Sequence, residues 1–223
     1  MNRPDSLVFA DRVDAGHRLA GQVARLGLDD PVVLGLARGG VPVARVIADE
    51  LGVGVEVFVA RKIAVPGFPE VGMAAIAEGS GEIVLGPQAS ELGFETGHLR
   101  SLAEEERREL QRRAALYRGE RALPEMAGRD VLLADDGVAT GVTAQAALSA
   151  LRRWRPRRLI FAAPVCARDA AEPIASLADS TVFLAVPQEF GSVGAWYERF
   201  EQLEDADVIR LATPARPGVE QRR

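Results

Sequence analysis

Residues 131–143 combine side chains and a spacing that suit the binding of an anion and a sugar. An apolar run ends in two adjacent carboxylates, Asp135 and Asp136, which are followed by small residues and by Thr140 and Thr143. Small residues let a backbone approach an anion, and a helix that begins there presents unpaired N–H groups to a phosphate. The carboxylates would repel that phosphate, so we expect them to bind hydroxyl groups elsewhere on the same ligand. The pattern predicts a phosphosugar site; the alternative is a strand end with solvated acids and a helix cap.

Two other apolar runs end in residues that suit phosphate binding. The run 31–37 is followed by Arg38 and by two glycines, which combine a cation with a backbone that a ligand can approach closely. The run 54–60 is followed by Arg61 and Lys62, and Lys62 is the only lysine among the 27 basic residues. A chain that uses arginine almost everywhere else has kept a compact, flexible ammonium group here, which points to a specific role for it.

Strands and helices are expected to alternate along the chain. The apolar runs are typical of buried strands, and helical periodicity follows them. This alternation predicts an α/β fold with a parallel sheet, flanking helices and a ligand at the carboxyl ends of the strands. A loop rich in Pro and Gly is expected at 65–72, and a hairpin around 78–81. We expect strands at 31–37, 54–60, 130–134, 158–164 and 181–186, and helices at 11–26, 43–51, 97–118, 143–154 and 169–178.

The segment LLADDGVATGVTA at 132–144 resembles the signature of the type I phosphoribosyltransferases, which have a Rossmann-like core. That signature is an apolar strand, two acidic residues, small residues and then Thr-Gly with a further Thr or Ser. In the family, the loop binds the 5-phosphate of phosphoribosyl pyrophosphate (PRPP) and the acidic pair binds the ribose hydroxyls. The resemblance implies that Asp135 and Asp136 hold the ribose during catalysis. It implies that the 5-phosphate is bound by Ala139, Thr140, Gly141, Val142 and Thr143.

The resemblance covers residues 31–186 and includes the other two phosphate-binding runs. Residues 36–40 resemble the family's pyrophosphate loop, which often contains a cis peptide without proline. Lys62 lies where the family has a basic residue that reaches the PRPP phosphates. Mg²⁺ is the implied cofactor, carried by PRPP and water, with Asp135 as the one candidate for a direct protein ligand. Pyrophosphate binding is implied for Arg38, Gly39, Gly40 and Lys62, with Arg38 and Lys62 also stabilising the leaving group.

We expect a single domain over residues 1–223, with a core at about 31–186, a flexible flap at about 64–85 and a C-terminal hood at about 187–212. The hood contains Phe190, Trp196 and Tyr197, which are candidates for contacts to a base. The alternative is that these aromatic rings attach the C-terminal segment to the core. Family members that act on 6-oxopurines have an aspartate at the position of Ala139, so a hypoxanthine or guanine acceptor is not expected.

The resemblance implies a transferase that moves the 5-phosphoribosyl group from Mg-PRPP to a nitrogenous base and releases pyrophosphate. The alternative is a non-catalytic PRPP-binding regulator. A nicotinamide or flavin enzyme is disfavoured, because Ala37 replaces the middle glycine of a dinucleotide fingerprint at 35–40. The arginine cluster at 152–158 is interpreted as cations that end a helix rather than as a nucleic-acid site.

Composition limits the remaining function classes. The 223 residues are 48% hydrophobic and carry a net charge of −5, which argues against general binding of polyanions such as nucleic acid. The aliphatic stretch 159–167 is far shorter than a membrane helix of ~20 residues, and the first residues lack the apolar segment of a signal peptide. These features predict a cytoplasmic protein, and the family resemblance implies a homodimer.

Overall fold

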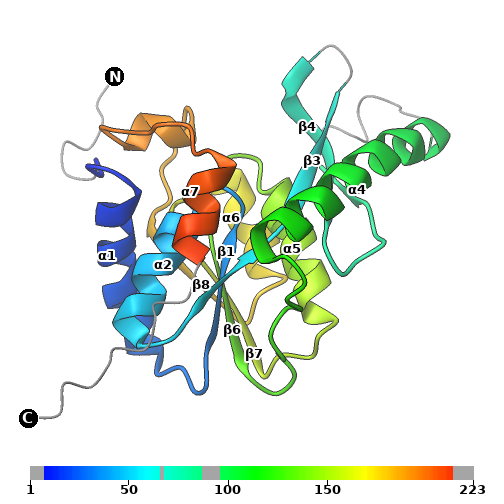
Figure 1. Ribbon diagram of the computed structural model, residues 1–223. Helices are drawn as coiled ribbons and strands as arrows, with labels where there is room; N and C mark the ends of the chain where they lie inside the picture. Colours follow the sequence, from blue (N-terminus) through cyan, green and yellow to red (C-terminus); the bar gives the residue numbers. More distant parts are fainter. Residues whose placement is uncertain (1–7, 66–67, 87–95, 213–223) are drawn as a thin grey trace, which may run out of the picture.

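A computed structural model describes residues 8–65, 68–86 and 96–212 of the protein, and a parallel sheet lies at its centre (Figure 1). Its strands are β1 (Val32–Leu36), β2 (Val55–Phe58), β6 (Asp130–Ala134), β7 (Arg158–Val165) and β8 (Ser180–Ala185). They lie in the order β2-β1-β6-β7-β8, and every neighbouring pair is parallel. From β1 the chain continues to β2 at one edge of the sheet, and from β6 it continues through β7 to β8 at the other edge. The carboxyl ends of β1 and β6 therefore flank the topological switch point, where such sheets bind ligands.

Helices cover both faces of this sheet: α1 (Arg12–Val23) with the 3₁₀ helix η1 (Ala24–Leu26), α2 (Gly40–Leu51), α5 (Val142–Arg152) and α6 (Arg168–Ala175). Alternate residues of a strand point to opposite faces. Leu132 and Ala134 of β6 pack in one cluster with side chains of α1 and α2, whereas Val131 and Leu133 pack in another with α5 and α6. Burial of both faces explains why β1, and β6 and β7 after their first residues, are continuous apolar runs.

A second, three-stranded antiparallel sheet leaves the core beside a long helix (Figure 1). It contains β3 (Ala60–Val65), β4 (Phe68–Ala77) and β5 (Val84–Leu85), and the helix is α4 (Thr96–Arg118). The pairing of β4 with β5 confirms the predicted hairpin. Two expectations were wrong. The expected strand 54–60 is divided at Val59 between the two sheets, so Lys62 lies inside β3 rather than after the end of β2.

The second error concerns the expected loop at 65–72, because β3 runs to Val65 and β4 begins at Phe68. Antiparallel backbone pairing of the two segments outweighs their Pro and Gly content, and the register shifts near Ala64 accommodate it. Residues 66 and 67, within the expected flap, lie outside the described residues.

The other predicted elements are confirmed with small changes at their ends. The helix expected at 97–118 is α4, and the strand expected at 130–134 is β6. The C-terminal hood contains the 3₁₀ helix η2 (Val193–Trp196) and α7 (Asp205–Ala212), and α7 packs against α2 and α4. None of the described helices has both the length and the apolar character that crossing a bilayer requires.

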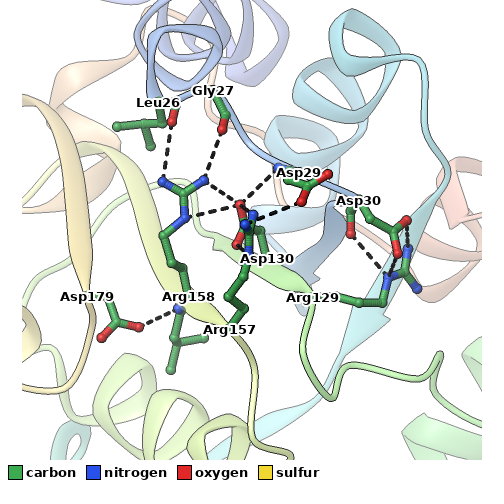
Figure 2. Close-up of polar contacts among 10 residues, drawn as sticks. Leu26, Gly27, Asp29, Asp30, Arg129, Asp130, Arg157, Arg158 and Asp179 are labelled. Carbon is green, nitrogen blue, oxygen red and sulfur yellow. Dashed lines mark hydrogen bonds and ion pairs between the residues drawn. The ribbon is translucent and has the colours of Figure 1, made fainter.

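The amino-terminal end of the sheet is closed by ion pairs around Asp130, the first residue of β6 (Figure 2). The Asp130 side chain is fully buried. Its Oδ1 accepts a hydrogen bond from Arg157 Nε at 2.9 Å, and its Oδ2 accepts bonds from Arg157 Nη2 at 2.7 Å, Arg158 Nε at 3.1 Å and the Asp29 N–H at 3.0 Å. Burial alone would raise the pKa of Asp130, but the bonds from Arg158, Asp29 and Arg157 outweigh it and hold that pKa well below its usual range.

Candidate functional site

Two loops meet at the switch point: the glycine loop (residues 37–40), which follows β1, and the acidic loop (residues 135–141), which follows β6. A Cβ atom on Gly39 would lie 2.0 Å from Oδ2 of Asp136, and one on Gly40 would lie 2.2 Å from the carbonyl oxygen of Ala134. Both distances are far inside van der Waals contact, so a side chain at position 40 would collide with the backbone, and one at position 39 would have to displace the Asp136 carboxylate. The structure therefore brings together the two segments in which the sequence predicted phosphate- and sugar-binding residues.

The glycine loop has a backbone unlike that of an ordinary strand-to-helix turn. The peptide bond between Ala37 and Arg38 is cis, as the family resemblance implies. The Ala37 N–H donates to the carbonyl oxygen of Phe58 at 2.9 Å, and α2 begins directly afterwards at Gly40. The loop thus lies at the amino-terminal end of a helix, where backbone N–H groups and the helix dipole favour an anion.

The side chain of Arg38 lies close to the hood. Its Nη1 is 3.8 Å from Oδ1 of Asp205, the first residue of α7. The Tyr117 hydroxyl of α4 donates to the same Asp205 oxygen at 2.6 Å. Burial, together with this bond to Asp205, raises the pKa of Tyr117 to about 12, so the phenol stays protonated. Sequence reasoning missed Asp205, since no local pattern links α7 to a loop more than 160 residues earlier.

The segment expected to bind the 5-phosphate forms the amino-terminal end of α5. Gly141 caps this helix with φ +75°, a left-handed conformation that side chains other than glycine rarely adopt. Ala139 and Thr140 are exposed, Val142 is buried and Thr143 is half-buried. The first N–H groups of a helix have no acceptor within it, so this end of α5 offers donors beside exposed small residues.

The acidic pair lies between these two helix ends. Oδ1 of Asp135 accepts the N–H of Asp136 at 2.9 Å. Burial, followed by the negative charge of Asp136, raises the pKa of Asp135 well above its usual range. Burial also raises the pKa of Asp136, although Arg12 opposes that rise. The two carboxyls therefore cannot both hold a negative charge as readily as surface aspartates do.

Arg12, the first residue of α1, is the partner of Asp136 that sequence reasoning missed. Its Nε donates to Oδ2 of Asp136 at 2.8 Å, and the two side chains are only 11% and 12% exposed. The two residues are 124 positions apart, and Arg12 is one of many arginines. Only the folded structure singles it out.

Lys62 lies on the face of the β3–β4 hairpin that is turned away from α4. The preceding residue, Arg61, is bound to Glu106 of α4, with Nε 2.7 Å from Oε2, and successive strand residues point to opposite faces. Lys62 is paired with Ala75, which belongs to the same apolar cluster as the α5 side chains. Residues paired across antiparallel strands share a face, so Lys62 lies on the face of the hairpin that packs against α5.

The predicted aromatic residues of the hood are packed into the protein. Trp196 and Tyr197 are 8% and 6% exposed and belong to an apolar cluster with Phe9. The Tyr197 hydroxyl donates to the carbonyl oxygen of Asp136 at 2.6 Å, and Trp196 Nε1 donates to the carbonyl oxygen of Phe190 at 3.1 Å. These contacts fit the alternative stated above, in which the rings attach the hood to the core.

Two further observations delimit the site. A cavity of about 300 Å³ lies between α4 and the turn after β4, and its lining includes Glu78, Leu110 and Gln111 but none of the predicted site residues. Across the described parts of the chain, no three His, Cys, Asp or Glu side chains are grouped so that they could hold a metal ion by themselves.

The sequence of the chain matches the model of a known protein family. The sequence model of the phosphoribosyl transferase domain matches residues 10–193, a range that contains both loops and the β3–β4 hairpin. Proteins from two Mycobacterium tuberculosis strains, H37Rv and CDC 1551, whose names class them as phosphoribosyl transferases, are each 37% identical to the chain over 202 residues. These matches cover 91% of the chain but 46% of each relative, so the chain spans about half the length of those proteins.

A solved structure resembles the whole described fold. The crystal structure of the protein TT1426 from Thermus thermophilus is 44% identical in sequence and superposes with a TM-score of 0.77. The match covers 92% of this chain and 97% of the Thermus chain. The likeness therefore extends over nearly the whole of both chains and is not confined to the central sheet.

Proposed function

The chain belongs to the phosphoribosyl transferase domain family, and we propose that it transfers the 5-phosphoribosyl group of PRPP to a nitrogenous base. In this reaction the bond between C1 of the ribose and a pyrophosphate oxygen breaks, and a bond between C1 and a ring nitrogen forms. Pyrophosphate leaves with the bonding electron pair, and the ring nitrogen releases its proton. Because such glycosyl transfer has oxocarbenium character, the site must hold the sugar, neutralise the leaving group and exclude water.

The observation that carries the proposal is the direct packing of the glycine loop against the acidic loop at the switch point. The contact between Gly39 and the Asp136 carboxylate joins the two loops. Each loop ends at the start of a helix, α2 or α5, so one ligand could meet two helix ends and a carboxyl at the same time. A phosphosugar with phosphates at its two ends and hydroxyls between them has this chemistry.

The amino-terminal end of α5 would bind the 5-phosphate. The donors are backbone N–H groups of the segment from Ala139 to Thr143 and the hydroxyls of Thr140 and Thr143. Charge-assisted hydrogen bonds contribute ~1.5–3 kcal/mol each, so a few of them suffice to hold a phosphate dianion. The left-handed conformation of Gly141 supports this role, because it turns the chain sharply where the helix begins.

The acidic loop and the glycine loop would share the rest of PRPP. Asp135 would accept hydrogen bonds from the ribose hydroxyls, while Arg38, Lys62 and the N–H groups at Gly39 and Gly40 would bind pyrophosphate. Mg²⁺ fits this donor set as an ion carried by PRPP oxygens and water, with the Asp135 carboxylate as the available protein oxygen; it would supply positive charge to the departing pyrophosphate.

The acceptor base would not be a 6-oxopurine. Ala139 occupies the acidic-loop position at which an aspartate would be needed to handle a purine ring proton, and it is exposed. The buried rings of Trp196 and Tyr197 leave the base to be held by other groups near the hood, among which Phe190 is half-buried. An adenine-type or pyrimidine-type acceptor is compatible with this environment.

The test is pyrophosphate release from Mg-PRPP across a panel of purine and pyrimidine bases, with PRPP binding measured in parallel by calorimetry. Asp135→Asn is the site variant, and Asp30→Asn, at the opposite end of the sheet, is the matched control. Release with one base that is lost in Asp135→Asn and kept in Asp30→Asn would support the transferase. PRPP binding without release across the panel would favour a PRPP-binding regulator, and absence of PRPP binding would refute the proposal.

A further inference from the structure

Arg12 holds three parts of the molecule with one guanidinium group. Its Nε donates to Oδ2 of Asp136 at 2.8 Å, and its Nη1 donates to the carbonyl oxygen of Glu201 at 2.9 Å. Its guanidinium carbon lies 3.9 Å from the centre of the Phe200 ring, as in a cation–π contact. Arg12 therefore connects α1, the acidic loop and the hood.

Three contacts fix the position of Asp136. Arg12 binds its carboxylate, Gly39 lies against the same carboxylate, and the Tyr197 hydroxyl binds its carbonyl oxygen. The Arg12–Asp136 pair is about nine-tenths buried, and removing one member of such a pair leaves a buried charge without a partner. Turning Oδ2 of Asp136 toward a sugar would break this pair.

Asp135 is placed differently. The hydrogen bond that the structure gives its carboxylate comes from the neighbouring Asp136 N–H, at 2.9 Å. The two adjacent aspartates are therefore not equivalent, although in the sequence they look like one acidic pair.

We propose that Arg12 is a positioning residue of the PRPP site, which withdraws Asp136 from the sugar and leaves Asp135 as the acidic residue that binds the ribose directly. The Arg12–Asp136 pair sets the separation of the glycine loop from the acidic loop, because the Asp136 carboxylate fills the space beside Gly39. The same guanidinium fixes the hood, so the position of the hood is tied to that separation. This inference rests on the proposed function, since it assumes that the ligand is PRPP.

The experiment measures the dissociation constant of Mg-PRPP by calorimetry for Arg12→Gln, Asp136→Asn and the double variant. All proteins are compared at a temperature at which circular dichroism shows them folded. Each single variant is expected to weaken PRPP binding roughly tenfold, as loss of a supporting contact behind a binding group commonly does. The double variant is expected to bind no more weakly than either single one, because the two substitutions remove the same interaction.

One further variant separates positioning from simple stability, and a second perturbs the contact between the two loops. Arg12→Lys is expected to recover part of the affinity, because an ammonium group can still bind Asp136. Gly39→Ala is expected to weaken PRPP binding like Arg12→Gln, because its methyl group must displace the Asp136 carboxylate. The matched control is Arg25→Gln, which removes an exposed arginine of η1 that is bound to Gln22 and should leave the dissociation constant unchanged.

The outcomes distinguish this inference from the proposed function. If the wild-type protein does not bind PRPP, the proposed function and this inference both fail. If it binds PRPP and Arg12→Gln binds equally well, Arg12 is only structural and this inference alone fails. It also fails if the effects of Arg12→Gln and Asp136→Asn simply add, or if Asp136→Asn weakens binding as much as Asp135→Asn while Arg12→Gln does not.

Discussion

The two ends of β6 place a buried and a half-buried aspartate in opposite electrostatic environments. At the amino-terminal end, Asp130 is surrounded by donors from Arg157, Arg158 and the Asp29 backbone, and its pKa is held well below the usual range (Figure 2). Just beyond the carboxyl-terminal end, the pKa of Asp135 is raised well above that range by burial and by the charge of Asp136. Only residues 131–134 separate a carboxylate that the protein stabilises from a carboxyl whose ionisation the protein disfavours.

This difference distinguishes a residue that stabilises the fold from one that we propose binds a ligand. Asp130 is neutralised by the chain itself, so its ionised form contributes to stability. Burial and the charge of Asp136 oppose the ionisation of Asp135, so its ionised form costs stability in the unliganded protein. Perturbed carboxyls of the second kind gather at functional sites because the same groups must be free to bind.

The largest expected effect is at the carboxyl-terminal end. Asp135→Asn removes the charge that we expect the ribose hydroxyls to contact, and two weakened charge-assisted hydrogen bonds amount to about 3 kcal/mol, or roughly 100-fold in the PRPP dissociation constant. The same variant should unfold at an unchanged or higher temperature, since it removes a buried carboxyl with a raised pKa. Calorimetry and thermal unfolding check the two halves of this prediction. A variant that lost stability while retaining PRPP affinity would erase the contrast between the two ends.

The second effect has the opposite signature. Asp130→Asn removes the buried charge that Arg157 and Arg158 share, and breaking a buried ion pair destabilises a protein by about 3 kcal/mol. For a chain of this length, that corresponds to a fall of roughly 6–12 °C in melting temperature. PRPP affinity should not change, because the substitution lies at the far end of the strand. Weaker PRPP binding by Asp130→Asn would contradict the prediction that Asp130 acts on stability alone.

Sequence reasoning predicted a candidate site where its signal was local. The strand, the acidic pair, the small residues and the helix start are contiguous in residues 131–143, so their geometry is largely determined within one β-loop-α unit. The glycine loop could also be recognised from contiguous residues, and its contact with the acidic loop follows from the pairing of β1 with β6.

The features that were missed depend on contacts between distant segments. Arg12 and Asp205 reach the site from the first and last described helices, and nothing in their local sequence distinguishes them from surface residues. The end of β3 at Val65 and the start of β4 at Phe68 were missed because Pro and Gly weaken local strand propensity, whereas pairing between the two strands stabilises the structure. The hood aromatics could be placed near the loops but not assigned to packing until Phe9 and the carbonyl oxygen of Asp136 were seen beside them.

The two ends should also respond to pH with opposite sign. The pKa of Asp130 in the folded protein lies below its unfolded value of about 4, so its stabilising contribution is present above that pH and is lost as the pH falls further. The pKa of Asp135 lies above that value, so stability is lost as the pH rises from about 4 through the folded-state pKa. In urea unfolding, the deficit of Asp130→Asn relative to wild type should shrink below pH 4, whereas Asp135→Asn should gain on wild type between pH 4 and pH 7. Parallel curves for either variant would contradict the assigned direction for that residue.

The smallest effect tests whether burial, rather than ion pairing alone, sets Asp130 apart. Asp30 lies at the same end of the sheet and pairs with Arg129, with Oδ2 2.7 Å from Nε, but its side chain is 69% exposed (Figure 2). Asp30 has φ +46°, and asparagine tolerates this left-handed conformation, so Asp30→Asn changes the charge without straining the backbone. An exposed ion pair contributes about 0–1 kcal/mol and is screened by salt, so the loss in urea unfolding should be well below that of Asp130→Asn and should vanish in about 1 M NaCl. A loss equal to that of Asp130→Asn, and insensitive to salt, would mean that the whole amino-terminal edge acts as one network and that the burial of Asp130 is not what distinguishes it.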